Sequence, residues 1–441
     1  MGRVGVGMKL SPDAVRTLLT SVFPSEFIDD CARECGVVER NRDIDIRMLV
    51  WTLAVGFAVG GETRSIADYR RAYNAATNQT IVASSFYDRF TENLQQLLSD
   101  LLEHALDEVA VPHHVSPEFD RFRDVIAADA TIFRLQQLLA EFQATHDDAS
   151  GVMLYLVHNV TDQSVISDEI TDETTHESTL FETGSWLRGR LFLLDLGFFK
   201  YRRFALIDEN DGFFLSRLKK SANPLITAAP RTLRGNSIEI EGEQVFDVVG
   251  DLRRQSIDID VVVGFKRREY DGQRSTDTKQ FRVVGVRNQD TDDYHLYMTN
   301  LPREEFSPEQ IATLYRARWE VELLFRELKS RYGLEEFDTS KEHIVKIQIT
   351  AALLTLVVSR AILRVLVDHA EERGEDATFP TERWATTFRS YAQLILMELA
   401  DLYGFPPPNI PELLYQEAKQ PAPGRKTLLE EVCSDLTAAE A

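Results

Sequence analysis

The chain has 441 residues and is strongly acidic, because 71 Asp and Glu residues against 49 Lys and Arg residues give a formal net charge of −22. This length allows two or three domains with a large hydrophobic core, and its three cysteines do not make a disulfide framework. The longest apolar runs are too short to span a membrane and the N-terminus lacks a signal-peptide layout. We therefore expect a cytoplasmic protein that does not contact a membrane.

The basic residues include few Lys and are unevenly distributed along the chain. Only 11 of the 49 are Lys, and none lies between Lys9 and Lys200, a composition similar to that of proteins from extreme halophiles. At molar salt the electrostatic screening length is about 3 Å, so the acidic balance argues only weakly against nucleic-acid binding. Residues 216–290 carry 14 Lys and Arg residues against 11 Asp and Glu residues, which makes this segment basic within an acidic chain.

The first part of the chain, residues 1–115, is predicted to be helical. A capping Ser followed by Pro opens it at Ser11, and residues 45–60 and 86–106 place apolar side chains at helical spacing. A group of arginines runs from the gap between these two stretches into the second of them. Its members are Arg64, Arg70, Arg71 and Arg89.

The pattern then changes three times. Residues 116–225 combine β-type runs with short helical stretches, including a helix over 176–190, and are predicted as the first part of an α/β core. Residues 226–305 alternate polar and apolar positions between turn residues, which predicts a β-rich insertion. Residues 306–370 form the second part of the core with long helices, and residues 371–441 are helical with Pro-rich interruptions.

One predicted helix, Leu314–Phe337, carries an unusual set of polar residues. Offsets of 0, 3, 7 and 14 place four of them within an arc of roughly 60° at about 100° per residue. They are Tyr315, Arg318, Glu322 and Lys329, with Arg326 close beside them. The ordinary explanation is an i, i+4 ion pair between Arg318 and Glu322 on a solvated face. The other explanation is a functional site, because the carboxylate of Glu322 on a mostly apolar helix requires a partner or a bound metal ion.

Two further carboxylates stand within apolar strand patterns, Asp129 in VIAADATIF and Asp195 in LFLLDLGFF. Either one alone is most simply explained as an Asp that caps a turn. Together with Glu322 they form the oxygen-ligand set that two Mg²⁺ ions prefer, with Mn²⁺ as a substitute. Two such ions about 3.5–4 Å apart activate the nucleophile and stabilise the leaving oxygen in phosphoryl transfer.

Tyr315, Arg318, Glu322 and Lys329 form one polar stripe along the predicted helix. The basic residues of this stripe suit phosphoryl transfer. Arg318 can bind a phosphate through a bidentate fork and Lys329 as a point charge. Tyr315 can donate a hydrogen bond to a phosphate or stack on a base. The stripe is therefore interpreted as one metal ligand with three contacts to a DNA end.

These residues resemble a known family. The spacing Tyr315-x2-Arg318-x3-Glu322-x6-Lys329 is similar to the YREK signature of insertion-sequence DDE transposases. ADAT around Asp129 resembles the first acidic motif of that family. LLDLGFF around Asp195, followed downstream by GFFLSRLK, resembles the second. The resemblance covers roughly residues 120–370.

The resemblance implies an α+β fold, with a ribonuclease-H-like α/β core interrupted by a β-rich insertion and flanked by helical N- and C-terminal regions. It implies cleavage of DNA at transposon ends and strand transfer by the freed 3′-OH, dependent on two Mg²⁺ ions held by Asp129, Asp195 and Glu322. The implied partners are double-stranded DNA, both terminal inverted repeats and target, and a second copy of the chain when DNA is bound. Trp319 matches the common pattern and is expected to pack in the interior.

DNA contacts are expected from the stripe, from the end of a predicted strand and from the N-terminal arginines. Outside the N-terminal region these residues are Tyr315, Arg318, Arg326, Lys329, Arg217 and Lys219. For the last two, a phosphate contact and a plain solvated charge are equally good explanations.

Two other functions remain open at this point. One is an inactive, transposase-derived DNA-binding protein that keeps its acidic residues. The other is a ribonuclease-H-like DNA endonuclease that cuts without strand transfer. A sugar hydrolase using paired carboxylates is remote, because it leaves the Arg and Lys of the stripe unexplained.

Overall fold

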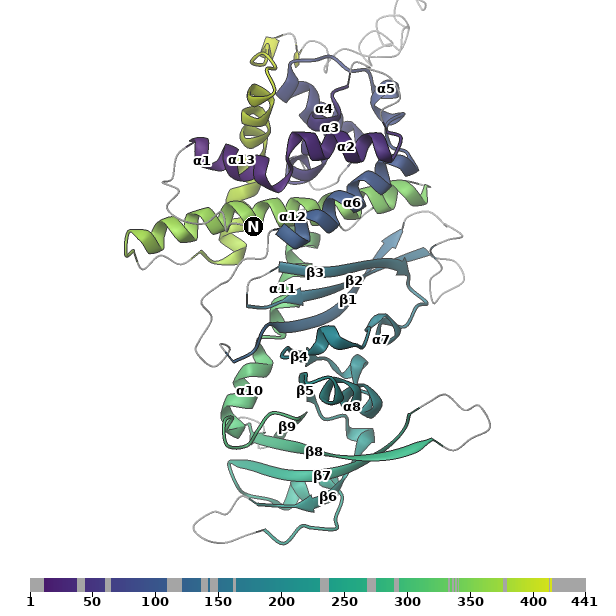
Figure 1. Cartoon of the computed structure of the whole chain (residues 1–441), viewed down its shortest axis with the longest axis vertical. Coiled ribbons are helices and arrows are strands. Elements are labelled where there is room, and N and C mark those ends of the chain that lie inside the picture. Colours follow the sequence, from purple (N-terminus) through teal and green to yellow (C-terminus); the bar gives the residue numbers. More distant parts are fainter. Residues whose placement is uncertain are drawn as a thin grey trace, which may run out of the picture.

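The molecule is elongated, with a helical body at one end and a long β-sheet running to the other (Figure 1). The computed structural model describes residues 12–37, 44–59, 65–108, 121–135, 142, 150–161, 164–230, 238–267, 275–288, 293–331, 334, 337, 339, 341–375, 379–411 and 413–414. The DNA contact predicted for Arg64 and the helical prediction beyond residue 414 fall outside these residues.

The helical body joins the two ends of the chain. Its N-terminal helices are α1 (Pro12–Val22), α2 (Ser25–Glu34), α3 (Ile46–Gly56), α4 (Ile66–Thr77), α5 (Ala83–Tyr87) and α6 (Glu92–Glu108), and its C-terminal helices are α12 (Glu342–Glu372) and α13 (Thr381–Leu402). Helix α12 packs against α1, α3 and α6, while α13 packs against α3 and α4. Helices α3 and α4 begin at side-chain caps, because Asp45 accepts a hydrogen bond from Met48 N at α3, and Ser65 and Asp68 form a reciprocal capping box at α4.

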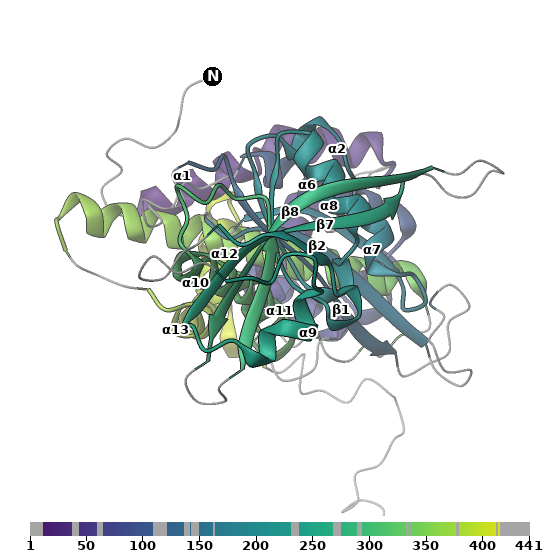
Figure 2. The same ribbon diagram turned by 90° about the horizontal axis from the view of Figure 1, so that it is seen from below.

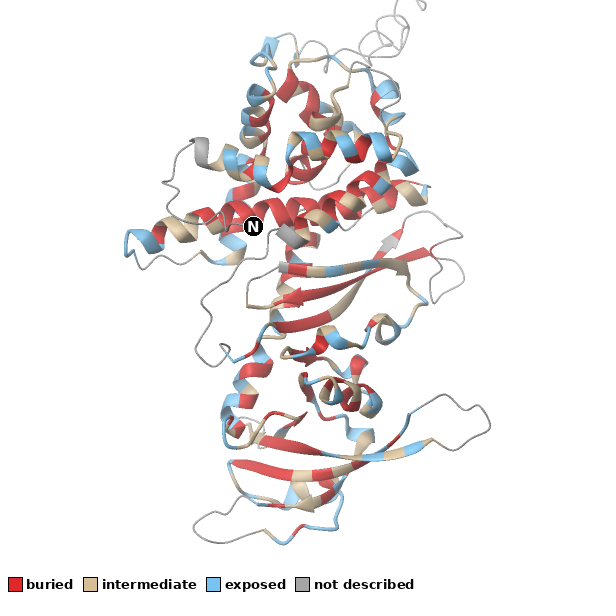
Figure 3. Cartoon of the chain, in the orientation of Figure 1, coloured by how far each residue is buried: buried red, intermediate tan, exposed pale blue. Residues whose placement is uncertain are grey.

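Helix α12 is the central element of this body. It is long and apolar enough to cross a membrane, with a mean hydropathy of 1.9 in its most apolar window, but 89% of that window is buried inside the protein. Figure 3 shows the buried colour along most of its length. One continuous core cluster includes residues of α12, the N-terminal helices and one face of the adjoining strands. The helix therefore packs as a core helix between the helical body and the sheet.

Within the described ranges, nine strands form one mixed sheet with the order β3-β2-β1-β4-β5-β9-β8-β7-β6. The strands are β1 (Val125–Leu135), β2 (Ser150–Asn159), β3 (Ser164–Asp172), β4 (Leu191–Leu194), β5 (Phe213–Arg217), β6 (Leu225–Ala228), β7 (Ser256–Lys266), β8 (Thr276–Arg287) and β9 (Tyr294–Thr299). Strands β1, β4 and β5 are mutually parallel, and every other neighbouring pair is antiparallel. The β-rich segment is joined to the first five strands by hydrogen bonding between β5 and β9.

The sheet is covered on both faces. Helix α10 (Pro308–Arg316) packs on one face with Leu193, Leu215 and Val284, and α8 (Tyr201–Glu209) packs on the other with Phe192 and Phe214. Figure 2 shows α10 and α8 on opposite sides of β7 and β8. Strand residues alternate between the two cores, as the period-two pattern predicts.

The loop before α10 is held by a buried charge cluster on β7 and β8. Arg282 donates hydrogen bonds to both carboxylate oxygens of Asp258, at 2.9 and 2.8 Å, and to the carbonyls of Leu301 and Phe306. Arg303 adds a bond to Asp258 at 3.1 Å. A buried charge of this kind is stable only when it is paired, so the cluster ties the outer strands to the start of α10.

Two helix predictions differ from the structure. Residues 176–190 contain only the short α7 (Glu177–Leu180) and a 3-10 turn at Ser185–Leu187, separated by Gly184. The predicted continuous helix Leu314–Phe337 is divided into α10, α11 (Trp319–Arg326) and the π-helical η5 (Glu327–Arg331).

The interruption between α10 and α11 is a short stretch of 3-10 hydrogen bonding. The amides of Ala317, Arg318, Glu320 and Val321 bond to carbonyls three residues earlier instead of four. Such 3-10 turns rotate more per residue than an α-helix. The polar stripe is therefore built from three consecutive elements and not from one regular helix.

Candidate active site

Two acidic residues from the sequence prediction stand side by side on the sheet. In the parallel registers, Ala128 pairs with Leu194 and Leu194 with Ser216. Asp129 and Arg217 therefore occupy the next positions on β1 and β5, and Asp195 directly follows the last residue of β4. Arg217 in turn pairs with Tyr297 on β9. We call Asp129, Asp195, Arg217 and Tyr297 the register row. Residues in register on neighbouring strands point to the same face, which here is the face that α10 and α11 cover.

The carboxylate of Asp129 is largely removed from water, with 19% of its side chain exposed. Its Oδ1 accepts a hydrogen bond from the amide of Ala130 at 2.9 Å. Burial raises the pKa of Asp129 to about 6, since the lowering effects of that amide and of Arg318 are smaller, and the negative charges of Glu177 and Asp195 raise it further. Asp129 is therefore a carboxylate whose charge needs compensation.

Arg318 supplies that compensation. Its Nη2 lies 2.5 Å from Oε1 of Glu322, and its Nη1 lies 3.8 Å from Oδ2 of Asp129. Burial alone would lower the pKa of Arg318, but the hydrogen bond to Glu322 and the nearby Tyr315 and Asp195 raise it instead. The i, i+4 ion pair considered for this helix is thus present, and it lies directly against Asp129 and not on a fully solvated face.

Tyr315 and Lys329 are both engaged with the strands of the site. The hydroxyl of Tyr315 donates to the carbonyl of Leu194 at 3.4 Å, its ring is 8% exposed, and it lies 5.2 Å from the ring of Tyr297. Nζ of Lys329 donates to the carbonyl of Ile132 at 3.1 Å and lies 5.0 Å from the ring of Phe133. Tyr315 therefore holds the residue directly before Asp195, and Lys329 holds β1 three residues after Asp129. A contact of either side chain with DNA stays a prediction.

The remaining predicted DNA contacts are exposed. Arg217 and Lys219 lie at the carboxyl end of β5, on the edge of the sheet where Asp195 also lies. Arg326, with 51% of its side chain exposed, lies 3.8 Å from Glu382 of α13. Trp319 was expected in the interior but is 49% exposed, because the turn between α10 and α11 directs it away from the core.

The sequence interpretation missed a fourth carboxylate, Glu177 of α7. Burial raises the pKa of Glu177, and the charge of Asp195 raises it further against the opposing charge of Arg203. Glu177 also lies against Gly197, two residues after Asp195. An acidic residue at the start of a helix is ordinary, so its position gave little sign of a role. The available signal was Gly197 in LLDLGFF.

The acidic residues fit divalent cations in chemistry, although their side chains are arranged around Arg318. Across the parts of the chain that the structure describes, no three His, Cys, Asp or Glu side chains are close enough together to hold a metal ion. The guanidinium of Arg318 provides the positive charge between Asp129 and Glu322. A donor set made only of carboxylates matches the oxygen preference of Mg²⁺ and Mn²⁺.

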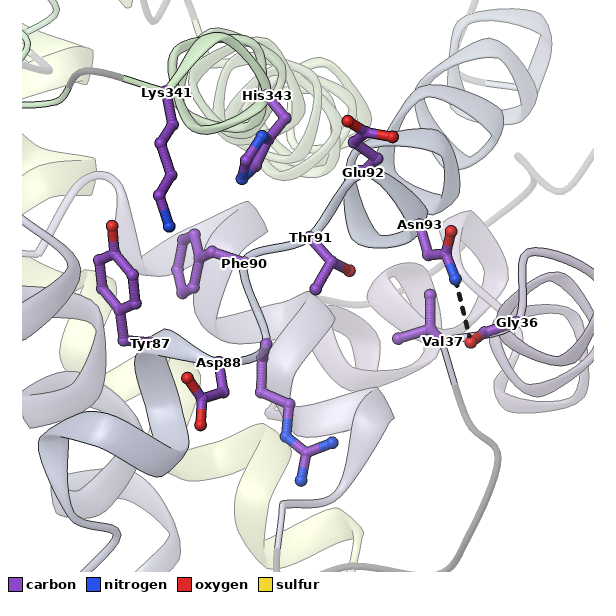
Figure 4. A pocket seen from close by; sticks show the side chains of 11 residues that line it. Gly36, Val37, Tyr87, Asp88, Phe90, Thr91, Glu92, Asn93, Lys341 and His343 are labelled. Atoms are coloured by element: carbon purple, nitrogen blue, oxygen red, sulfur yellow. Dashed lines mark hydrogen bonds between the residues drawn. The ribbon is translucent and has the colours of Figure 1, made fainter.

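A cavity of about 610 Å³ lies elsewhere, in the helical body (Figure 4). Its lining comes from the end of α2, the α5–α6 turn and the start of α12, and includes Arg89, Lys341 and His343. Nζ of Lys341 lies 4.9 Å from the ring of Tyr87. Arg89 is thus placed in a partly basic hollow, whereas Arg70 donates to the carbonyl of Ile81.

Comparison with known proteins places this geometry in a family. A family described as "Transposase DDE domain" matches residues 120–358. The transposase for insertion sequence element IS231F of Bacillus thuringiensis subsp. israelensis is 21% identical over 373 residues, which cover 75% of this chain and 76% of that protein. The putative transposase InsL for insertion sequence element IS186A of Escherichia coli strain K12 is 33% identical over 94 residues, 21% of this chain and 25% of that one.

A solved structure with a similar fold is the piggyBac transposase in its synaptic complex with hairpin DNA. The TM-score is 0.51 at 10% sequence identity, and the match covers 93% of this chain and 87% of that chain. The predicted fold class, a mixed α+β chain with a ribonuclease-H-like core, is confirmed by this likeness and by the mixed sheet. Because the family match spans more than half of the sequence, the chain belongs to the DDE-domain transposase family.

Proposed function

We propose that this transposase cuts DNA at the ends of its own mobile element and joins the freed 3′-OH to target DNA, with Asp129, Asp195 and Glu322 as its acidic triad. The observation that carries the proposal is the register row, which brings Asp129 and Asp195 to adjacent strands beneath the segment that holds Glu322. The spacing of the YREK-like residues along that segment supports the same assignment.

The three carboxylates would hold two Mg²⁺ ions, or Mn²⁺ ions, which supply activation of the attacking oxygen and charge stabilisation at the leaving oxygen. Arg318 keeps Asp129 and Glu322 neutralised before the ions bind, and is then free to bind a phosphate beside the scissile bond. Tyr315 holds the carbonyl of Leu194 and so the direction in which Asp195 points.

DNA is proposed to lie across the carboxyl edge of the parallel strands and along the exposed side of α11. Arg217, Lys219 and Arg326 present exposed cationic side chains there. The hollow that contains Arg89 and Lys341 is proposed as a second contact, in the helical body. Because two transposon ends must be joined, we propose that two copies of the chain assemble on DNA.

The test is cleavage of a labelled duplex that ends in the element's own terminal sequence, at high salt with Mg²⁺. The wild type is expected to cut at the element's end, and Glu322→Gln to cut about 100-fold less or not at all, because a charged metal ligand is lost. Glu304→Gln removes one charge from an exposed position and serves as the matched control.

Each alternative has its own outcome in the same assay. Cutting followed by joining to an added target duplex supports the transposase, and cutting without joining points to a nuclease of this fold. Binding without cutting, across all salts and with Mg²⁺ or Mn²⁺, contradicts the proposed chemistry and supports an inactive DNA-binding relative.

A further inference from the structure

Glu177 lies against the turn that follows Asp195. It begins α7, between β3 and β4, and α7 packs against the 3-10 turn Leu196–Phe198. A Cβ atom placed on Gly197 would lie 1.9 Å from Oε1 of Glu177. The glycine therefore leaves the space that this carboxylate fills, and the carboxylate reaches the backbone two residues beyond an acid of the triad.

Arg203 holds the Leu196–Phe198 turn that Glu177 contacts. Arg203 is 7% exposed, donates a hydrogen bond to the carbonyl of Phe198 at 2.5 Å, and lies 5.0 Å from the ring of Phe181. The lowering of the pKa of Arg203 to about 10 comes mainly from burial, with Tyr155 and Glu177 opposing it. This scaffold fixes the position of the turn without closing an ion pair to Glu177.

Glu177 has no hydrogen-bond or ion-pair partner among the residues that the structure describes. A half-buried carboxylate facing a second carboxylate is unfavourable unless a cation or donors compensate it. The ordinary alternative, a glutamate directed to water, does not account for the contact with Gly197 or for the closeness of Asp195.

A second observation comes from Tyr155 on β2. Its ring is 3% exposed, and its hydroxyl is buried without a hydrogen-bond partner in the described structure. Tyr155 pairs with Ala130 and so points to the face of the sheet opposite Asp129, where its ring lies 6.1 Å from the ring of Phe198, in the turn that Glu177 contacts. The charges of Arg203, Glu177, Asp129 and Glu182 act on its hydroxyl. Buried hydroxyls nearly always have a partner, so this one indicates that a bound group or its water shell belongs beside Glu177.

We infer that Glu177 is a fourth carboxylate of the active site and that it shares with Asp195 the binding of one divalent cation. The inference rests on the proposed function, because it assigns one more oxygen ligand to the same pair of ions. Hard cations take more than three ligand oxygens and use carboxylates together with water. The Tyr155 hydroxyl is then the donor to the carboxylate or to a water on the ion.

The experiment measures Mn²⁺ binding to the full-length protein directly, by the electron paramagnetic resonance signal of free Mn²⁺. It is done at molar KCl, because an acidic chain also attracts cations weakly over its surface. The variants are Glu177→Gln, which removes the charge, and Gly197→Ala, which keeps the charge but displaces the carboxylate. Glu304→Gln, an exposed site, is the matched control for the lost charge.

The expected result is a Kd for Mn²⁺ about tenfold or more weaker in both Glu177→Gln and Gly197→Ala, with Glu304→Gln unchanged. The combination of both substitutions should be no weaker than Glu177→Gln alone, because both remove the same contact. Unchanged Mn²⁺ affinity in Glu177→Gln overturns the inference.

Cleavage by the same proteins separates this inference from the proposed function. If the wild type cuts and Glu177→Gln binds Mn²⁺ and cuts as the wild type does, the inference fails and the transposase assignment stands. If the wild type does not cut, the assigned chemistry fails, and the Mn²⁺ measurement still decides whether Glu177 binds a cation.

Discussion

Arg318 is the residue on which the charge balance of the site depends. Its guanidinium bonds Glu322 and lies near Asp129, so one positive charge faces two acids from different elements. This contact offsets the negative charges of Asp129 and Glu322. Under the proposed function, a cation would compete with Arg318 for the same oxygens.

Replacing Arg318 with Gln should therefore separate cation binding from catalysis. We expect Arg318→Gln to bind Mn²⁺ severalfold more tightly, because the competing charge is gone, yet to cut DNA at least about tenfold more slowly, because a phosphate contact is lost. Free Mn²⁺ and single-turnover cleavage measure the two effects. Arg316→Gln, an exposed position two residues earlier, is the control. Mn²⁺ binding that is weaker than in the wild type would contradict competition.

At the scale of elements, the π-helical η5 is held by one buried ion pair. Arg360 of α12 donates to Oε2 of Glu327 at 2.5 Å, and these side chains are 10% and 2% exposed. Glu327 lies between Glu322 and Lys329, so the pair determines how the last turns of the stripe meet β1. The irregular turn is thus explained by a tertiary contact and not by local helix preference.

Breaking this pair should destabilise the fold strongly. Glu327→Gln leaves the charge of Arg360 buried without its partner, and we expect the free energy of unfolding to fall by about 3–5 kcal/mol. The double substitution Glu327→Leu with Arg360→Met should recover most of the loss. Urea denaturation followed by circular dichroism measures both.

The matched control for that experiment is Glu342→Gln, which breaks a partly exposed i, i+4 pair with Lys346, whose two side chains are 34% and 27% exposed. It should cost less than about 1 kcal/mol. Equal losses from the buried pair and the partly exposed pair would show that η5 is not held in this way.

The elements that the sequence predicted well are those with a local signal. The strand runs around Asp129 and Asp195 follow from short continuous apolar runs that are buried on both faces of the sheet. The start of α10 follows from a capping Ser before Pro, Ser307 and Pro308. The sequence predicts one continuous helix over Leu314–Phe337, because apolar spacing does not indicate the tertiary ion pair between Arg360 and Glu327. Glu177 was missed for a related reason, since the turn that it contacts, at Gly197, is distant in sequence.

The pairing of β5 with β9 could not be predicted from local sequence patterns either. Alternating polar and apolar residues predict that strands exist in the β-rich segment, but which strand lies beside which depends on non-local packing. The register row that unites Asp129, Asp195, Arg217 and Tyr297 appears only once both kinds of pairing are known. Three of its members, Asp129, Asp195 and Arg217, are predicted from the sequence as two metal ligands and a DNA contact, but no local pattern indicates that they lie in one row.

At the scale of the whole molecule, the net charge of −22 should make stability depend on salt. Like charges repel in the folded state, and added KCl screens this repulsion. We expect Tm to rise by at least about 5 °C between 0.1 and 2 M KCl. Scanning fluorimetry in KCl, with equal osmolarities of sucrose as the control, measures the effect. A Tm that is constant or lower in KCl would contradict the halophile-like interpretation of the composition.

The continuity of the sheet also bears on how the chain can be shortened or exchanged. Strand β5 has neighbours on both sides, β4 and β9, so removing residues 226–305 would expose its unpaired backbone next to Asp195. An open strand edge of this kind invites pairing with other chains. The β-rich segment therefore stabilises the edge of β5 and cannot be removed as an independent domain. Any graft or truncation of this transposase must keep β9 in place to protect the edge beside its acids.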